Sequence, residues 1–462
     1  MVSFSNLDLL IIFGFFAIVL LIGFLSGKKK EQNAEEYLLS GRRVGFFLFV
    51  LTTVSTWYGG ILGVGEFTYR YGILNWVTQG LPYYIFAFLF ALFFAKKIRN
   101  ASLITIPDKL HRVYGKKVGI VSSILIFILV SPAPYLLMFA NLLSIIFNIN
   151  LLSALIISFI LSASYLYFAG YKGDILTDAF EFFVMFGGFI VIVFITFSQF
   201  GGFDFLKTNL PSEHLTPLGG SSVSYVVVWF LIAIWTFIDP GFHQRCYSAM
   251  NGNVAVKGIL ISIILWAFFD FLTTSTGLYS KAILPDLENP SLAFPMLAEK
   301  ILGPGLKGIF YAGMLATVLS TLNSFIFLSA TTFGNDFLNR IKVKPSTSKL
   351  KSYTQIGLTV TGIISIIFAF LLPSVIELWY TIGTICIPGL ILPVIGSYYS
   401  RIKISDKLTL LEIISGFLFS GIFYFIKTFN QDIALFQIIE PMLVGLAISI
   451  LVHLYGLMSK AK

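Results

Sequence analysis

Charged residues, cysteines and histidines are all scarce in this chain, and their scarcity excludes most soluble classes. Only 11% of the 462 residues are charged, whereas 57% are hydrophobic, and the mean hydropathy is +0.90. A soluble globular domain carries about twice that share of charge. The two cysteines, Cys246 and Cys386, are expected at different depths, and the 4 histidines are scattered, so we expect neither a disulfide framework nor a structural metal site. The composition predicts an all-α polytopic membrane protein.

Long apolar runs mark the membrane-spanning segments. A run of about 18 residues or more is long enough to cross a bilayer as a helix. About 13 such runs follow one another, and the first has the full length of a span. The predicted spans lie at 7–27, 44–65, 75–95, 118–146, 151–169, 174–199, 222–240, 255–279, 307–333, 353–372, 374–398, 409–426 and 434–457.

The net charge of +9 is distributed as a topology signal. With the N-terminus placed outside, the loops expected inside hold 25 of the 31 Lys and Arg residues, and 6 remain outside. Cytoplasmic loops of membrane proteins carry such an excess. We therefore expect a multi-pass protein of the plasma membrane with its N-terminus outside and its C-terminus inside. The lipid bilayer is its expected partner, and nucleic acid is not.

The apolar run at 307–333 carries hydroxyl groups along one wall. Thr317, Ser320, Thr321 and Ser324 follow at i, i+3, i+4 and i+7, a spacing that aligns them on one helix face. Hard cations bind oxygen ligands, so this face would supply part of a cation site if another helix supplied the rest. Small and hydroxyl residues also let membrane helices pack closely. The stretch alone leaves both interpretations open.

Two spans contain helix breakers at membrane depth. The run at 44–65 has four glycines between positions 59 and 65, which either unwind the helix and expose carbonyls or form packing seams. The run at 222–240 ends at Asp239 and Pro240, which stop or kink a helix. We predict that both spans are broken helices.

The broken spans are the second and the seventh, five spans apart, which is the pattern of a repeat. Because five is odd, the second copy enters the membrane from the opposite side, and such inverted repeats bind their solute near mid-membrane. We predict a single transporter domain over residues 1–462. Its parts would be a first span at 7–27, repeat 1 at 44–199, repeat 2 at 222–398 and two extra spans within 409–457.

The sixth predicted span begins with three acids on one face, Asp174, Asp178 and Glu181. Ionisable residues are costly inside a membrane and usually mark an ion or proton path. We expect Asp174 at the interface, within reach of water. Asp178 is open to three interpretations: an interfacial acid, a carboxylate on the exit route of a cation, or a cation ligand.

Six motifs stand in a fixed order over about residues 8–400. They are Glu36-Tyr-Leu-Leu-Ser-Gly-Arg42, Ser55-Thr-Trp-Tyr-Gly-Gly60, Tyr69-Arg-Tyr-Gly72, Thr177-Asp178, Asp239-Pro240 with Gln244-Arg245, and Leu319-Ser-Thr-Leu-Asn-Ser324 followed by Asn335-Asp336. In this order and spacing they resemble the sodium/solute symporter family, whose members have the LeuT-type fold. The resemblance implies cotransport of Na+, as the coupling ion, with a small organic solute. It also implies about 13 core spans, including the 5+5 inverted repeat of spans 2–6 and 7–11 with spans 2 and 7 broken.

The resemblance also implies sodium ligands. The family's main sodium site maps onto the backbone carbonyls of Ser55, Tyr58 and Thr317 and the hydroxyls of Ser320 and Thr321. A subset of the family binds a second sodium, which maps onto Asp178, Ser320, Asn323 and Ser324. At Asn323 the family usually has a hydroxyl residue.

The solute cannot be copied from the family, because Trp57, Gly59 and Gly60 stand where some members have an acid or other polar groups. No Lys or Arg is expected at mid-span, so we predict a neutral or zwitterionic solute such as a sugar, an amino acid or a nucleoside-like compound. Each candidate contact could also serve plain packing. The candidates are Trp57, Tyr58, Gln79, Tyr83, Tyr135, Trp235 and Asp239.

The predicted function is a sodium-coupled symporter that works by alternating access. The alternative is an uncoupled channel or a membrane sensor on the same scaffold. We do not expect an enzyme or an organic cofactor, because the sequence shows no nucleophile with a base, no cluster of His with acids and no phosphate loop. The oligomeric state stays open.

Overall fold

The computed structural model describes residues 2–27, 33–342, 346–372, 375–430 and 439–461, and over these ranges the chain is helical, with a β-bridge between Val44 and Ala249. Twelve of its helices are long and apolar enough to cross a membrane, and the count rises to 13 when one sharply bent pair is taken as a single span. The polytopic all-α prediction is confirmed. Positions 374 and 434–438 of the predicted spans lie outside the described residues.

The α-helices are α1 (Asn6–Ser26), α2 (Ala34–Leu39), α3 (Phe46–Ser55), α4 (Ile61–Tyr71), α5 (Leu81–Phe90), α6 (Lys96–Ala101), α7 (Ile106–Leu129), α8 (Ala133–Phe147), α9 (Leu151–Ala169), α10 (Tyr171–Phe200), α11 (Phe203–Asn209), α12 (Val223–Ile232), α13 (Pro240–Ser248), α14 (Gly252–Ile283), α15 (Ala293–Ile301), α16 (Leu306–Thr331), α17 (Asn339–Ile341), α18 (Leu350–Leu371), α19 (Val375–Tyr398), α20 (Asp406–Phe429) and α22 (Pro441–Ala461). Short 3-10 and π segments join them: η1 (Ser40–Arg42), η2 (Thr56–Tyr58), η3 (Trp76–Gly80), η4 (Ala91–Ala95), η5 (Ser212–Leu215), η6 (Ala233–Ile238), η7 (Pro290–Leu292), η8 (Thr332–Leu338) and η9 (Thr347–Lys349).

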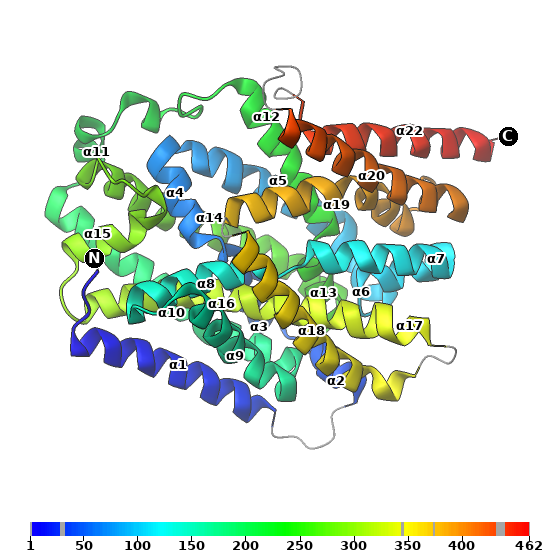
Figure 1. Cartoon of the computed structure of the whole chain (residues 1–462), viewed down its shortest axis with the longest axis horizontal. Helices are drawn as coiled ribbons and strands as arrows, with labels where there is room; N and C mark the ends of the chain where they lie inside the picture. The colour runs from blue at the N-terminus through cyan, green and yellow to red at the C-terminus, as the bar shows by residue number, and fades with distance from the viewer. Residues whose placement is uncertain (1, 28–32, 343–345, 373–374, 431–438, 462) are drawn as a thin grey trace.

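The central element is α16, which lies in the middle of the bundle (Figure 1) and is buried without interruption from Phe310 to Thr331. It packs against α10, α18, α1 and α8. Its approach to α10 is close because two glycines face each other: a Cβ added to Gly313 would lie 3.1 Å from the Cα of Gly188. Small residues allow this proximity in membrane helices, so the packing interpretation of this helix is correct for part of its surface.

The second predicted span is broken, as expected. Helices α3 and α4 meet at an angle of 57°, with η2 between them. The bend lies at the glycines, since Gly59 and Gly60 stand between the end of η2 and the start of α4. Carbonyls of this region are therefore outside a continuous helix and are free to meet other partners.

The seventh span is also broken but extends further than its apolar run indicated. It proceeds through α12 and η6, is extended at Asp239, and restarts as α13. The Asp239 carboxylate accepts a hydrogen bond of 2.9 Å from the Phe242 N–H, so it caps α13, and Pro240 occupies the first helical position. The predicted end at 240 was too early, because the polar residues after Pro240 resemble a loop in hydropathy although they form a buried helix.

Candidate cation and solute sites

The break of the second span lies directly against the hydroxyl wall of α16. A Cβ added to Gly59 would lie 2.4 Å from the Cβ of Thr321, so only glycine allows this contact. The Thr321 hydroxyl donates 2.8 Å to the carbonyl of Thr56 and lies 3.4 Å from the carbonyl of Thr317. The Ser320 hydroxyl is 3.4 Å from Oγ1 of Thr56. Oxygen atoms from two separate spans thus gather at one buried point.

The other predicted ligands of the main sodium site use their side chains elsewhere. The hydroxyl of Ser55 donates 3.0 Å to the Leu51 carbonyl, and that of Thr317 donates 2.7 Å to the Gly313 carbonyl. The Tyr58 hydroxyl donates 2.8 Å to the carbonyl of Trp266. Ser55, Tyr58 and Thr317 therefore have only backbone oxygens left for an ion, which agrees with the role that the resemblance implies. A group of neutral oxygens is the ligand set that hard cations prefer, so the residues fit sodium.

Asp178 is completely buried on α10 and faces the same region. Its carboxylate accepts a 2.6 Å hydrogen bond from Ser320 and lies 3.2 Å from the Thr56 hydroxyl, and the Thr52 hydroxyl also donates to it. A buried carboxylate with several donors is well satisfied. Asp178 therefore links α10 to both α16 and the broken span.

Arg245 is the functional candidate that the sequence analysis missed, because it was placed in a loop. It lies in α13 with a side chain only 4% exposed, and its Nη2 is 3.6 Å from Oδ2 of Asp178. The same nitrogen donates 3.2 Å to Ser324 and also donates to Thr56. The capping residue Asp239 followed by proline was the signal of a restarting helix that could have placed Arg245 inside the fold.

The residues predicted for a second sodium point in different directions. The Asn323 amide donates to the Tyr165 hydroxyl and accepts from Ser162, both on α9. The Ser324 hydroxyl donates 2.8 Å to the carboxylate of Asp174. Asp174 is completely buried, so its expected place at a wet interface was wrong. The three residues of α16 thus contact three different groups, and only Ser320 contacts Asp178.

The predicted solute contacts fall into two groups around the breaks. In the first, the ring of Trp57 lies 5.2 Å from that of Tyr83 and 5.1 Å from that of Trp266, and the Tyr58 ring lies 4.5 Å from Phe269. Such edge-on and tilted rings form an aromatic cluster between the second, third and eighth spans.

The second group surrounds the break of the seventh span. The Trp235 indole donates 2.9 Å to the Asp239 carboxylate, so these two side chains hold each other in place. The Tyr135 ring lies 4.6 Å from that of Phe325 on α16. Gln79 is half-buried in η3. Five of the seven candidates, Trp57, Tyr58, Tyr83, Trp235 and Asp239, thus lie at a break or contact a residue that does.

A model of the sodium:solute symporter family matches residues 37–401. The chain belongs to this family. The sodium/pantothenate symporter of Haemophilus influenzae is 25% identical over 394 residues, which cover 81% of each chain. A high-affinity choline transporter of Caenorhabditis elegans is 23% identical over 403 residues, covering 79% of this chain and 69% of that one. A solved Na+-coupled sialic acid symporter aligns over 99% of this chain and 98% of its own at a TM-score of 0.82 and 17% identity, which shows the fold.

As a member of the sodium:solute symporter family, the chain is a multi-pass membrane transporter that couples sodium to the movement of a small solute. The LeuT-type fold prediction is confirmed. No observation favours the alternative of an uncoupled channel or a sensor. The division of the chain into repeats and extra spans stays a prediction.

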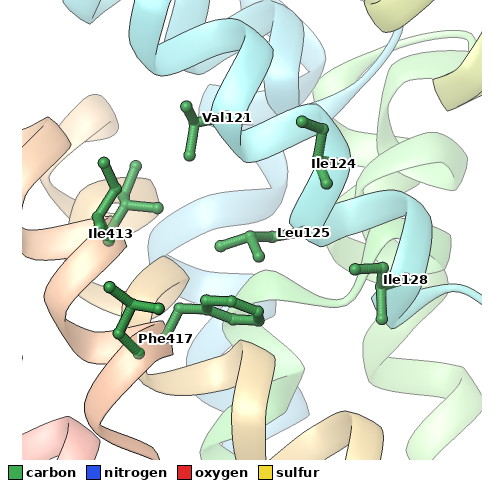
Figure 2. A pocket seen from close by; sticks show the side chains of 8 residues that line it. Val121, Ile124, Leu125, Ile128, Ile413 and Phe417 are labelled. Atoms are coloured by element: carbon green, nitrogen blue, oxygen red, sulfur yellow. The ribbon is translucent and has the colours of Figure 1, made fainter. Parts of the chain in front are cut away.

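One groove of the symporter lies away from its predicted site residues. It runs between α7 and α20 and is lined by apolar side chains, as Figure 2 shows for Leu125 and Phe417. No polar group is available there to orient a solute. The groove has the character of a lipid-facing surface and lacks the polar groups of a solute site.

Proposed function

We propose that the coupling sodium binds between the break of the second span and the hydroxyl wall of α16. Its ligands would be the carbonyls of Ser55, Tyr58 and Thr317 with the hydroxyls of Ser320 and Thr321. The supporting observation is the contact of Gly59 and the Thr56 carbonyl with Thr321. Because two parts of the molecule would share one ion, sodium would hold them together and favour one conformation of the alternating-access cycle.

We further propose a neutral or zwitterionic solute, bound at mid-membrane next to the aromatic cluster and Asp239. Relatives are named for pantothenate and choline, which differ in charge and therefore do not point to one solute class. Arg245, the one buried Lys or Arg near the breaks in the part of the chain that the structure describes, is already paired with Asp178 and offers no free charge to an anion. Aromatic rings with a few polar groups suit a small polar organic molecule.

The proposed orientation places the N-terminus outside and the C-terminus inside the plasma membrane. The excess of Lys and Arg in alternate loops supports it. In this orientation the Asp174 end of α10 is the inner end. A second sodium at Asp178, Ser320, Asn323 and Ser324 stays a prediction, and it requires Arg245 to leave Asp178.

The main site is tested by sodium titration of purified variants. Ligands that bind the folded state raise its thermal stability, so the midpoint of sodium-induced stabilisation reports affinity without a known solute. Ser320→Ala and Thr321→Ala each remove an oxygen ligand and should raise the midpoint tenfold or more, a loss of about 1.4 kcal/mol.

The matched control is Thr331→Ala. Thr331 is buried on the same helix, and its hydroxyl has no hydrogen-bond partner among the described residues, so its sodium midpoint should stay within about twofold of wild type. If Ser320→Ala and Thr321→Ala also kept the wild-type midpoint, this face of α16 would serve packing alone. Screening neutral, zwitterionic and charged solutes with and without sodium by the same assay would identify the solute class.

A further inference from the structure

Glu181 is a buried acid whose carboxyl group has no hydrogen-bond partner among the described residues. It lies in α10, three residues beyond Asp178, and its side chain is 0% exposed. Both of its carboxyl oxygens are buried. Asp178, one turn away, has an ion pair and three hydroxyl groups around it. Glu181 therefore differs from its neighbour in having nothing that would stabilise a negative charge.

The charges around Glu181 are unbalanced. Asp174, Asp178 and Glu181 share one face of α10, and all three are completely buried. Arg245 is the buried cation that pairs with this face, so three ionised acids would leave an excess of two negative charges. An ionised carboxylate without a partner is strongly disfavoured in a low-dielectric interior.

The other helices packed against α10 bring no further compensating charge to Glu181 in the described ranges. From α9 comes the neutral phenol of Tyr165, whereas the facing groups of α16 and α3 are hydroxyls and an amide. Titratable groups of α1, α14, α2 and α15 are engaged elsewhere or exposed. They are Asp8 with the Gly305 and Gly308 N–H groups, Asp270 with Tyr84, Tyr279 with the Gly201 carbonyl, Lys281 with the Pro285 carbonyl, Tyr37 with the Leu166 carbonyl, Glu35 with Arg42, Glu299 with Lys307, the half-buried Glu36, and the exposed Lys257 and Lys300.

We propose that Glu181 is a proton-binding site. The proton neutralises its carboxyl in the conformation described here, and it leaves for water when a cation binds nearby, because a neighbouring positive charge stabilises the carboxylate that remains. A proton suffices to neutralise one buried carboxyl group, and it does not need the shell of several oxygen ligands that a metal ion needs. The exchange with sodium rests on the proposed function, whereas the presence of the proton does not.

The proton is detected directly by infrared spectroscopy of the purified full-length protein in sodium-free buffer at pH 7. A protonated carboxyl group has a carbonyl stretch that a carboxylate lacks. We expect this band in the wild type and its loss in Glu181→Gln, which keeps the shape of the neutral acid but cannot bind a proton. The matched control is Glu412→Gln, since Glu412 is equally buried but accepts a hydrogen bond from His453, and it should keep the Glu181 band.

A wild type without the band, or a band that keeps its full wild-type intensity in Glu181→Gln, would overturn the proposal. Should Glu181→Gln fail to fold, Glu181→Met replaces it, because an apolar side chain is tolerated where a neutral acid without hydrogen bonds was buried. Loss of folding in both variants would contradict a neutral Glu181.

Sodium exchange is tested on the same samples. Added sodium should weaken the band, and by linkage the sodium midpoint should improve as pH rises, by at most tenfold per pH unit, in the wild type and not in Glu181→Gln. Sodium that stabilises the protein yet leaves the band unchanged would refute the exchange. If sodium did not stabilise the protein at all, the proposed function would fail. The band measured without sodium would still show whether Glu181 is protonated.

Discussion

At the scale of single residues, the buried pair of Asp178 and Arg245 can be tested directly by mutation. Both side chains are almost fully buried, 3.6 Å apart. Removing one charge of a buried pair leaves the other uncompensated and costs roughly 3–5 kcal/mol. We expect Asp178→Asn to lower the free energy of unfolding by about 3 kcal/mol, measured by titration with sodium dodecyl sulfate in mixed micelles.

The double variant Asp178→Asn with Arg245→Gln should recover most of that loss, because no unpaired charge remains. Asp270→Asn is the matched control, since Asp270 is buried and accepts from Tyr84 but has no ion pair among the described residues, and it should cost less. A larger loss of unfolding free energy in Asp270→Asn than in Asp178→Asn would contradict a structural ion pair.

The single variant Asp178→Asn also tests the second sodium site. If Asp178 binds that ion in another conformation, Asp178→Asn should lower the charge moved per solute, and the Hill coefficient for sodium should fall towards one. An unchanged ratio of charge to solute in proteoliposomes would remove Asp178 from the list of ligands. Slower turnover at an unchanged ratio would indicate a carboxylate on the exit route.

Residue-level prediction from the sequence succeeded where a motif fixed a contact and failed where burial decided the role. The spacing of Ser320 and Thr321 indicated a polar face, and that face does meet the break of the second span. Asp174 and Arg245 were both misplaced, because hydropathy assigns charged residues to water and a buried partner on another helix cannot be seen in a linear sequence. The complete burial of Glu181 was equally invisible.

At the scale of elements, the close contact between the second span and α16 depends on Gly59, which has no side chain. An added Cβ at Gly59 would lie 2.4 Å from Thr321, and overpacking a tight contact costs about 1–3 kcal/mol. We expect Gly59→Ala to separate the break from α16 and to raise the sodium midpoint at least tenfold in the thermal assay.

Gly63→Ala is the control for this change. It lies in the same span, but its added Cβ would be 3.5 Å from Trp379, an ordinary contact, so its sodium midpoint should stay close to that of the wild type. Wild-type sodium affinity in Gly59→Ala would show that the close contact does not define the ion site.

The start of α13 offers a second test, on the role of Asp239. Its carboxylate caps the helix at the Phe242 N–H and also accepts from Trp235. Asn retains capping, whereas Ala loses it at a cost of about 1 kcal/mol. If Asp239 contacts a positive group of the solute, Asp239→Asn should keep stability but lose solute affinity.

The opposite result would be an Asp239→Asn variant with wild-type solute affinity, together with an Asp239→Ala variant that loses solute affinity and stability to the same extent. In that case Asp239 would serve only to cap α13. The measurement is solute-induced thermal stabilisation, once the screen has supplied a solute, alongside unfolding of the solute-free variants. Both element-scale tests concern the breaks, which the sequence located correctly because glycine and proline act on the backbone itself.

At the scale of the whole molecule, the orientation in the membrane is open to direct labelling. The native Cys246 and Cys386 are buried, so they give a low background or can be replaced. We expect Ser212→Cys, in the segment after α11, to react with a membrane-impermeant maleimide in intact cells. Ser459→Cys, near the end of α22, should react only after permeabilisation.

Both introduced positions are exposed in the fold, so a lack of reaction reports the membrane side. The reverse labelling pattern would invert the topology inferred from Lys and Arg. The spans themselves were predictable because their length is set by bilayer thickness, whereas the extension of the seventh span to Ser248 was not, since a polar helix inside the bundle has no hydropathy signal.

The acids of α10 also bear on how the protein is made. The cost of inserting a charged residue through the translocon reaches roughly 2.5–3.5 kcal/mol at the centre of a spanning helix and is smaller towards its ends. The three acids of α10 lie in its first three turns, before a long apolar stretch to Phe200, so this figure is an upper bound for each of them. Arg245 is synthesised later than α10, so the nascent chain must enter the membrane before Asp178 has its counter-ion. Until then the hydroxyls of Thr52 and Thr56, already translated, are the groups that can shield it. We therefore expect α3 and α10 to associate early in the biosynthesis of this transporter, before α13 is made.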